Sequence, residues 1–135
     1  MRVLLDTNTL ISAAIAKGKP RRLLLKALAN EFVLITSNEL LGELEEVISR
    51  PKFGLSYFEK NKFLNTVKNT VQIVKVKSDF KVVKEDPDDD LVVNTAYDGD
   101  VAYVVSGDPD LLRLKGFERI KIVTADKMLK ILTLE

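Results

Sequence analysis

The 135-residue sequence contains neither cysteine nor histidine. The lack of cysteine excludes disulfides, thiolate nucleophiles and cysteine zinc sites, and the lack of histidine removes imidazole ligands and the usual base of a serine triad. Catalysis would have to use carboxylates, lysines, hydroxyl groups or water activated by a metal ion. A ligand set made of oxygen atoms suits Mg²⁺ or Mn²⁺ better than Zn²⁺.

Long apolar runs are also missing, since no stretch approaches the roughly 18 apolar residues of a membrane span. The N-terminal segment MRVLLD reaches an acid at Asp6, too early for the apolar core of a signal peptide. We therefore expect a cytoplasmic protein that does not enter the membrane. Hydrophobic residues make up 46% of the chain and no Pro/Gly/Ser-rich linker divides it, so we expect a single domain over residues 1–135.

Short apolar runs alternate with helical patterns along the whole chain. The runs predict five strands, at residues 2–5, 32–36, 71–76, 101–106 and 120–124. The helical patterns fall at residues 9–16, 20–30, 37–49, 56–70, 88–98, 109–114 and 125–132. This alternation predicts the α/β class, as a three-layer α/β/α sandwich whose central, mainly parallel sheet has about five strands.

Six aspartates stand where such a fold binds ligands, because two of their clusters directly follow predicted strands. They are Asp6, Asp86, Asp88, Asp89, Asp90 and Asp108. At about 4 Å and an effective dielectric constant near 20, each contact between like charges costs roughly 4 kcal/mol. A divalent cation is the simplest ion that would neutralise such a cluster.

Helix capping offers a competing explanation for several of these acids. Asp86-Pro87-Asp88 and Asp108-Pro109-Asp110 each read as an N-cap, a proline in the first turn and an acid that favours the helix dipole. The glutamates of SNELLGELEEVIS are equally ambiguous, because Glu43 and Glu45 flank opposite edges of one apolar stripe. Gly42 weakens that helix by about 1 kcal/mol relative to alanine, which indicates close packing or close approach beside it.

Four fragments in this order resemble the PIN domain, the nuclease fold of VapC-type toxins and of the compact toxin-like PIN proteins of prokaryotes. They are VLLDTNTLISA, TSNELLGELEEVISRP, DPDDDLVVNTA and YVVSGDPDLL, and together they span nearly the whole chain. The resemblance implies a metal-dependent endoribonuclease, a hydrolase of RNA phosphodiester bonds that uses Mg²⁺ or Mn²⁺. It also implies a toxin with a small antitoxin partner, and a homodimer.

The resemblance assigns the site residue by residue. The implied catalytic acids are Asp6, Glu43, Asp89 and Asp108, of which Asp6, Asp89 and Asp108 would bind the metal. The supporting residues are Asn8, Asp90 as a neighbour that could replace Asp89, and Ser106, where the family more often has threonine. The L-x-E-L pattern at Leu41–Leu44 favours Glu43 over Glu45.

Basic residues that follow the first motif are the expected contacts to RNA phosphates, namely Lys17, Lys19, Arg21 and Arg22. Aromatic residues make up only 7% of the chain, and Phe53, Tyr57, Phe58 and Phe63 are spaced as packing residues, so we expect most of them in the core. The helix pair predicted over residues 37–70 is our candidate for the interface with an antitoxin or a second copy, because its apolar content is generous for one face.

Three other functions could use acids at strand ends. A phosphoacceptor receiver domain would need an acidic pair near the first strand, where Asp6 stands alone. A catalytically silent PIN-like module that binds RNA or protein would have the same acids. An aspartyl-phosphate phosphatase would need a second aspartate two residues after the first, where this chain has Asn8.

Overall fold

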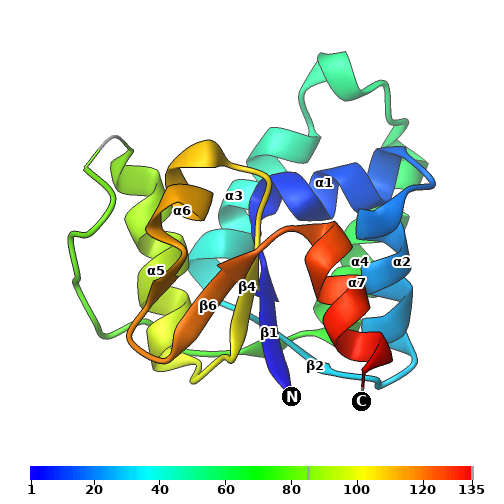
Figure 1. The fold of residues 1–135 in the computed structure, drawn as a ribbon. Helices are drawn as coiled ribbons and strands as arrows, with labels where there is room; N and C mark the ends of the chain where they lie inside the picture. Colours follow the sequence, from blue (N-terminus) through cyan, green and yellow to red (C-terminus); the bar gives the residue numbers. More distant parts are fainter. Residues whose placement is uncertain (85, 135) are drawn as a thin grey trace.

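A six-stranded sheet crosses the molecule in the computed structural model, which describes residues 1–84 and 86–134 (Figure 1). The spatial order of its strands is β3-β2-β1-β4-β6-β5, and every neighbouring pair is parallel except β5 and β6. The strands are β1 (Arg2–Leu5), β2 (Val33–Thr36), β3 (Gln72–Ile73), β4 (Tyr103–Val105), β5 (Gly116–Phe117) and β6 (Ile120–Val123). The predicted α/β class with a mainly parallel sheet is therefore confirmed.

Helices cover both faces of this sheet and make the outer two layers (Figure 1). One face carries α1 (Thr7–Ile15), α2 (Lys19–Leu28), α3 (Asn38–Ile48), α4 (Tyr57–Thr70) and α7 (Ala125–Thr133), and the other carries α5 (Pro87–Asp98) and α6 (Pro109–Leu114). A short 3₁₀ helix, η1 (Pro51–Phe53), lies between α3 and α4. Because side chains alternate along a strand, Val3 and Leu5 enter the first layer's core and Leu4 enters the second.

Side-chain caps begin the helices at the carboxyl ends of the strands. Asp6 follows β1 and caps α1, Ser37 follows β2 and caps α3, and Thr124 follows β6 and caps α7. Each cap residue satisfies a backbone N–H of the first turn that has no partner inside the helix. Short polar residues at strand ends therefore set where each helix starts, and they also place carboxylates at this edge of the sheet.

Strand β3 is only two residues long, although residues 71–76 read as a strand, because the chain leaves the sheet at this point. The Val74 N–H still donates to Thr36 O at 2.9 Å, but the N–H groups of Lys77 and Ser78 donate to the Asp98 carboxylate of α5 at 2.6 and 2.8 Å. Strand β5 was not predicted, because an antiparallel strand of two residues is too short to show an alternating pattern in the sequence. At Gly116 an added Cβ would lie 2.6 Å from Ile120 O, so this turn requires glycine.

Residues 77–83 run along the outside of α5, and we call this segment the strap. Three α5 side chains at four-residue spacing bind the strap, namely Asp90, Asn94 and Asp98. The Asn94 side-chain oxygen accepts from Phe80 N at 2.7 Å. The Asp90 carboxylate accepts from the N–H groups of Val82 and Val83 at 3.0 and 2.8 Å. The strap thus obtains its hydrogen bonds from one helix face and not from a neighbouring strand.

Two packing expectations are wrong. Phe53 and Phe63 do pack against the core, but Tyr57 and Phe58 are 81% and 73% exposed, because α4 begins before it reaches the core residues Leu64 and Val67. Gly42 is exposed and an added Cβ would meet no atom within 4 Å, so the protein does not pack closely there. Among the described residues, no helix has the length and apolar character needed to span a membrane.

Candidate active site

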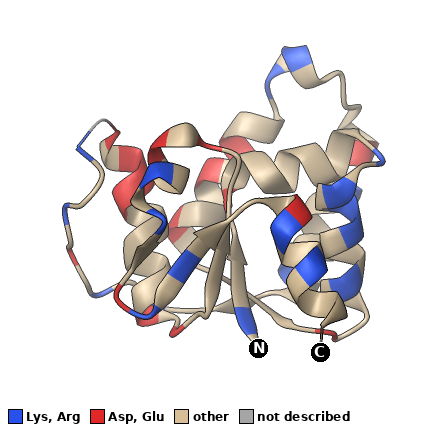
Figure 2. Cartoon of the chain, viewed as in Figure 1, with Lys and Arg blue, Asp and Glu red and all other residues tan. Residues whose placement is uncertain are grey.

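Acidic residues gather at the edge of the sheet where β1 and β4 end, on α3, α5 and the first turn of α6 (Figure 2). Residues 86–110 contain eight aspartates and no lysine or arginine, a net charge of −8, whereas the whole chain has a net charge of +1. Six of these aspartates lie at the amino ends of α5 and α6, and the other two, Asp98 and Asp100, lie at the far end of α5. Parallel strands bring Asp6 and Asp108 to the same edge, since β1 and β4 are neighbours in the sheet. The topology thus concentrates negative charge at one place.

Asp6 is 5% exposed and its carboxylate is held from two sides. Its Oδ1 accepts from Thr9 N at 2.9 Å, and its Oδ2 accepts from the Ser106 hydroxyl. Burial raises the pKa of Asp6, although the hydrogen bonds from Ser106 and Thr9 partly oppose this, and the negative charge of Asp108 raises it further. Asp6 is therefore a fixed carboxylate whose negative charge is destabilised by its surroundings.

Ser106 links Asp6 to Asp108. The Ser106 side chain is buried, at 1% exposure, and while its hydroxyl donates to Asp6 its Oγ accepts from Asp108 N at 2.9 Å. Asp108 Oδ1 accepts from Asp110 N at 2.8 Å and so caps α6. Capping uses one of the two carboxylate oxygens of Asp108, so a helix cap and a metal ligand are compatible roles for this residue.

Three carboxylates come close enough to share an ion. Asp86, Asp89 and Asp108 each present one oxygen, and these three oxygens lie within 4.8 Å of one another. Asp89 is 9% exposed, and its Oδ2 is the buried side-chain oxygen that lacks a hydrogen-bond partner in the described part of the chain. Burial raises the pKa of Asp89 to about 7, with a further increase from Asp108. A bound proton or cation would therefore relieve the unfavourable negative charge at this position.

Glu43 of α3 belongs to the same electrostatic environment. Burial raises the pKa of Glu43, a hydrogen bond from Thr7 lowers it, and the charges of Asp88 and Asp6 raise it further. Glu45, the alternative that the helical stripe left open, instead makes an ion pair with Lys68 of α4. The two glutamates therefore lie in different surroundings, one beside the acids and one at the α3–α4 contact.

The remaining predicted site residues lie around this cluster in different ways. Asn8 is exposed and lines a hollow of about 170 Å³ together with Ser106 and Gly107. Asp90 directs its carboxylate to the strap, as described above. Asp86 joins Asp89 and Asp108, although the sequence left it open between a helix cap and a ligand and it was not assigned to the site. The repeated Asp-Pro-Asp motif was the available signal, because Asp108 has the same motif and was assigned to the site.

The four basic residues expected to contact RNA lie on the other face of the sheet from α5 and α6. Arg21 donates its guanidinium to Ala13 O and Ala14 O at 2.8 and 2.9 Å, which ties α2 to the end of α1. Lys19 pairs with Asp126 of α7. Lys17 and Arg22 are exposed. Their contact with substrate remains a prediction.

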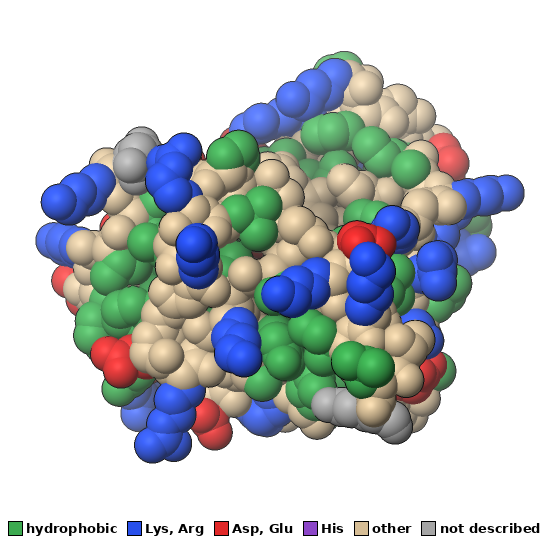
Figure 3. Space-filling view, viewed as in Figure 1, with side chains coloured by type: hydrophobic (Ala, Val, Ile, Leu, Met, Phe, Trp, Pro, Cys, Tyr) green, Lys and Arg blue, Asp and Glu red, His purple; other side chains and the backbone are tan. Residues whose placement is uncertain are grey.

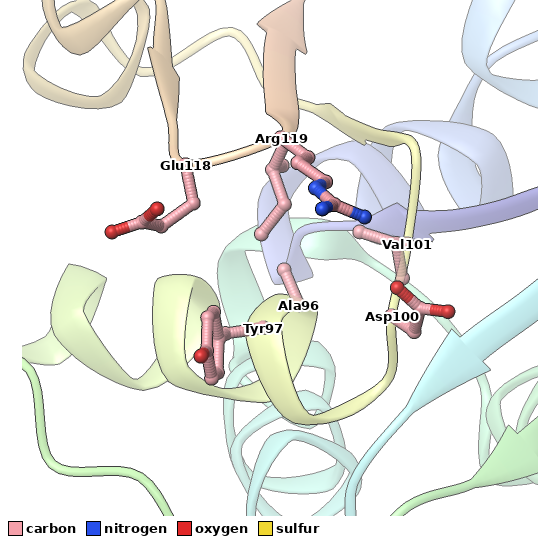
Figure 4. A pocket seen from close by; sticks show the side chains of 7 residues that line it. Ala96, Tyr97, Asp100, Val101, Glu118 and Arg119 are labelled. Carbon is pink, nitrogen blue, oxygen red and sulfur yellow. The ribbon is translucent and has the colours of Figure 1, made fainter.

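A larger hollow of about 440 Å³ lies at the opposite edge of the sheet (Figure 4). Arg119 extends beside Ala96 and Val101 in it, and Asp100 and Glu118 flank the opening. Both acids adopt positive φ angles, 52° and 55°. The residues that line this hollow come before β4 or at the start of β6, so the hollow lies at the amino ends of these strands. It therefore does not adjoin the acids that follow β4.

Comparison with known proteins identifies the family of this chain. A protein-family model described as PIN domain matches residues 2–110. That span includes Asp6, Glu43, Asp89 and Asp108. A search of curated proteins and a search of solved structures each found no match to the chain.

Proposed function

We propose, from the premise that this chain belongs to the PIN domain family, that it is a Mg²⁺- or Mn²⁺-dependent endoribonuclease. PIN domains are generally nucleases, which hydrolyse phosphodiester bonds. The observation that supports the proposal most strongly is the cluster of Asp86, Asp89 and Asp108, with carboxylate oxygens within 4.8 Å of one another. We extend the proposal to the whole of residues 1–135, as one nuclease domain.

The residues present fit a hard divalent ion. All the available donors are carboxylate oxygens, and Asp89 Oδ2 is buried without a partner. Mg²⁺ is commonly bound by a few carboxylates, water and substrate phosphates. We infer that Asp89 and Asp108 would hold the ion with Asp86 and Asp6 close by, and that Ser106 would fix Asp6 and Asp108 relative to each other.

When bound, such an ion would supply positive charge to the phosphoryl oxygens and would lower the pKa of water. The chain itself would supply orientation, because Asp6 is held by Thr9 and Ser106 and has little freedom to move. Glu43 has a raised pKa and is half-buried, so it is suited to accept a proton from the attacking water. The concentrated negative charge would also repel RNA that arrives without cations.

The test is cleavage of a fluorophore-quencher RNA by the purified protein with Mg²⁺, with Mn²⁺ and with EDTA. We expect cleavage with either ion, none with EDTA, and a loss of more than about 100-fold in Asp6→Asn and Asp108→Asn. Asp79→Asn, a change at an exposed aspartate of the strap, should retain activity. Cleavage that persists in Asp6→Asn would overturn the proposal, and RNA binding without cleavage would indicate a silent binding module.

We further propose that the protein acts in the cytoplasm as a toxin, with a small antitoxin that covers the acidic site, and that it forms a homodimer. These assignments rest on the family resemblance. Induced expression in a bacterial host should arrest growth, and Asp6→Asn should remove the arrest while leaving the amount of protein unchanged. Arrest by both proteins would contradict a toxin that acts through this site.

A further inference from the structure

Two aromatic side chains project into solvent at the start of α4. Tyr57 and Phe58 are 81% and 73% exposed, more than any other aromatic residue in the described ranges 1–84 and 86–134. Exposing such large apolar side chains to water is unfavourable, so two adjacent exposed aromatic residues indicate an interaction site. The capping box formed by Ser56 and Glu59 fixes the start of the helix, and with it the position of this pair.

The pair continues into a polar stripe along α4. A hollow of about 450 Å³ is lined by Tyr57, Phe58, Asn61, Lys62, Asn65, Thr66 and Asn69, and we call this surface the α4 face. The spacing of four residues from Tyr57 to Asn69 places these side chains on one side of the helix, over about 18 Å. Among the described residues that line it there is no acid.

The segment that carries the α4 face is strongly basic. Residues 50–70 contain five basic residues and one glutamate, a net charge of +4, in a chain whose total is +1. Arg50 and Lys68 have carboxylate partners in α3, whereas Lys52 and Lys60 lie over the rings of Phe53 and Tyr57. Figure 2 shows basic residues on the projection between α3 and α4, and the space-filling view of Figure 3 shows basic side chains there with hydrophobic side chains beneath them.

We propose that the α4 face binds the single-stranded RNA substrate, through stacking of bases on Tyr57 and Phe58 and contacts of phosphates with Lys62. Lys52 of η1, which precedes α4 in the chain, would contribute a further phosphate contact. This inference rests on the proposed ribonuclease function. Unpaired bases are accessible for stacking on aromatic side chains, whereas the bases of a duplex are not. Asparagine amides can bond the edges of such bases.

A second copy of the chain fits this surface less well. In a two-fold symmetric dimer the same patch contacts itself, so the lysines of both copies would face one another. Juxtaposed like charges oppose association. RNA is negatively charged, so it complements the positive charge of residues 50–70. The negative charge of residues 86–110 would repel RNA.

The experiment measures binding of a fluorescein-labelled 12-nucleotide RNA by anisotropy, on an Asp6→Asn background that prevents cleavage. Tyr57→Ala/Phe58→Ala should weaken binding by at least about tenfold. Leu25→Ala/Leu28→Ala, which truncates two exposed apolar residues of α2, is the matched control and should stay within about twofold of the parent. Lys52→Gln/Lys62→Gln should reduce the slope of log affinity against log salt by about 1.4.

Circular dichroism and sedimentation on the same samples separate the outcomes. Unchanged RNA affinity in the folded aromatic variant would overturn the inference, and so would a change from dimer to monomer with RNA affinity retained. Cleavage by the wild-type protein that depends on metal and Asp6, together with unchanged binding by the variant, would leave the ribonuclease function standing and reject only the α4 face. Absence of both cleavage and binding in the parent would reject both.

Discussion

Replacing Asp89 by asparagine should stabilise the metal-free protein while it abolishes metal-dependent activity. The Asp89 carboxylate is 9% exposed, lies close to Asp86 and Asp108, and has one oxygen without a hydrogen-bond partner. Its pKa is raised from 3.8 to about 7, which corresponds to at most about 4 kcal/mol of unfavourable free energy in the ionised folded state. Asparagine has nearly the same shape and removes that charge.

The sign of the pH dependence follows from the raised pKa. Between 3.8 and about 7 the folded wild type holds the Asp89 proton while the unfolded chain has released it, so stability falls as the pH rises through this range. The asparagine variant has no such group, and its advantage in EDTA should grow by up to roughly 2–3 kcal/mol between pH 5 and pH 8. A gain of about 2 kcal/mol raises the melting temperature by roughly 6–10 °C in a chain of this length.

The assay is thermal unfolding in EDTA at pH 5 and pH 8, and then at pH 8 with Mn²⁺. Excess Mn²⁺ should raise the melting temperature of the wild type and leave that of Asp89→Asn unchanged, since an ion that binds only the folded state stabilises it. Asp88→Asn is the control, because Asp88 is exposed in the first turn of α5 and its loss should destabilise by less than about 1 kcal/mol. An Asp89→Asn protein less stable than wild type in EDTA at pH 8 would refute the reasoning.

Three further substitutions test individual contacts. Ser106→Ala removes the hydroxyl that joins Asp6 to the backbone of Asp108, so it should lower the free energy of unfolding by about 1–3 kcal/mol and also reduce cleavage. Urea unfolding and the RNA assay measure the two effects, and unchanged stability would contradict the role of this hydroxyl. Burial raises the pKa of Asp98, but hydrogen bonds from Ser78 and Lys77 outweigh it and hold the pKa below its usual value. The Asp98 carboxylate therefore stabilises the fold above about pH 4, and this contribution is lost on further acidification. Asp98→Asn should lower the free energy of unfolding by about 1–3 kcal/mol at pH 7 and accelerate hydrogen exchange of the strap amides. Exchange protection equal to that of the wild type would contradict this role of Asp98. Gly42→Ala should raise stability by up to about 1 kcal/mol, because an added Cβ meets no atom within 4 Å; a lower melting temperature would show an unseen contact.

The order of strands and helices was predictable because local signals were strong. Continuous apolar runs marked the buried strands, and residues such as Ser37 and Pro109 marked helix starts. The strand at β3 was predicted, but its early end and the course of the strap were not, because residues 77–83 find their partners on α5, some 7–21 positions further along the chain. The pattern of apolar and polar residues within 77–83 contains no information about a hydrogen-bond partner so far along the chain.

The candidate site was partly visible for a related reason. Acids that follow strands, such as Asp6 and Asp108, could be placed at one edge of the sheet from topology alone. Capping and clustering use the same residue types, so the sequence could not show that Asp86 both caps α5 and approaches Asp89. Exposure of Tyr57 depends on where α4 projects beyond the core, which is a property of the packed structure.

The proposed nuclease chemistry depends on a divalent ion bound by the acids at this edge of the sheet. An anomalous difference map from a crystal of the protein grown with Mn²⁺ would locate such an ion. We expect a peak bonded to carboxylate oxygens of Asp89 and Asp108, near Asp6 and Asp86. A map without a peak at these residues, at Mn²⁺ concentrations that support cleavage, would contradict this proposal.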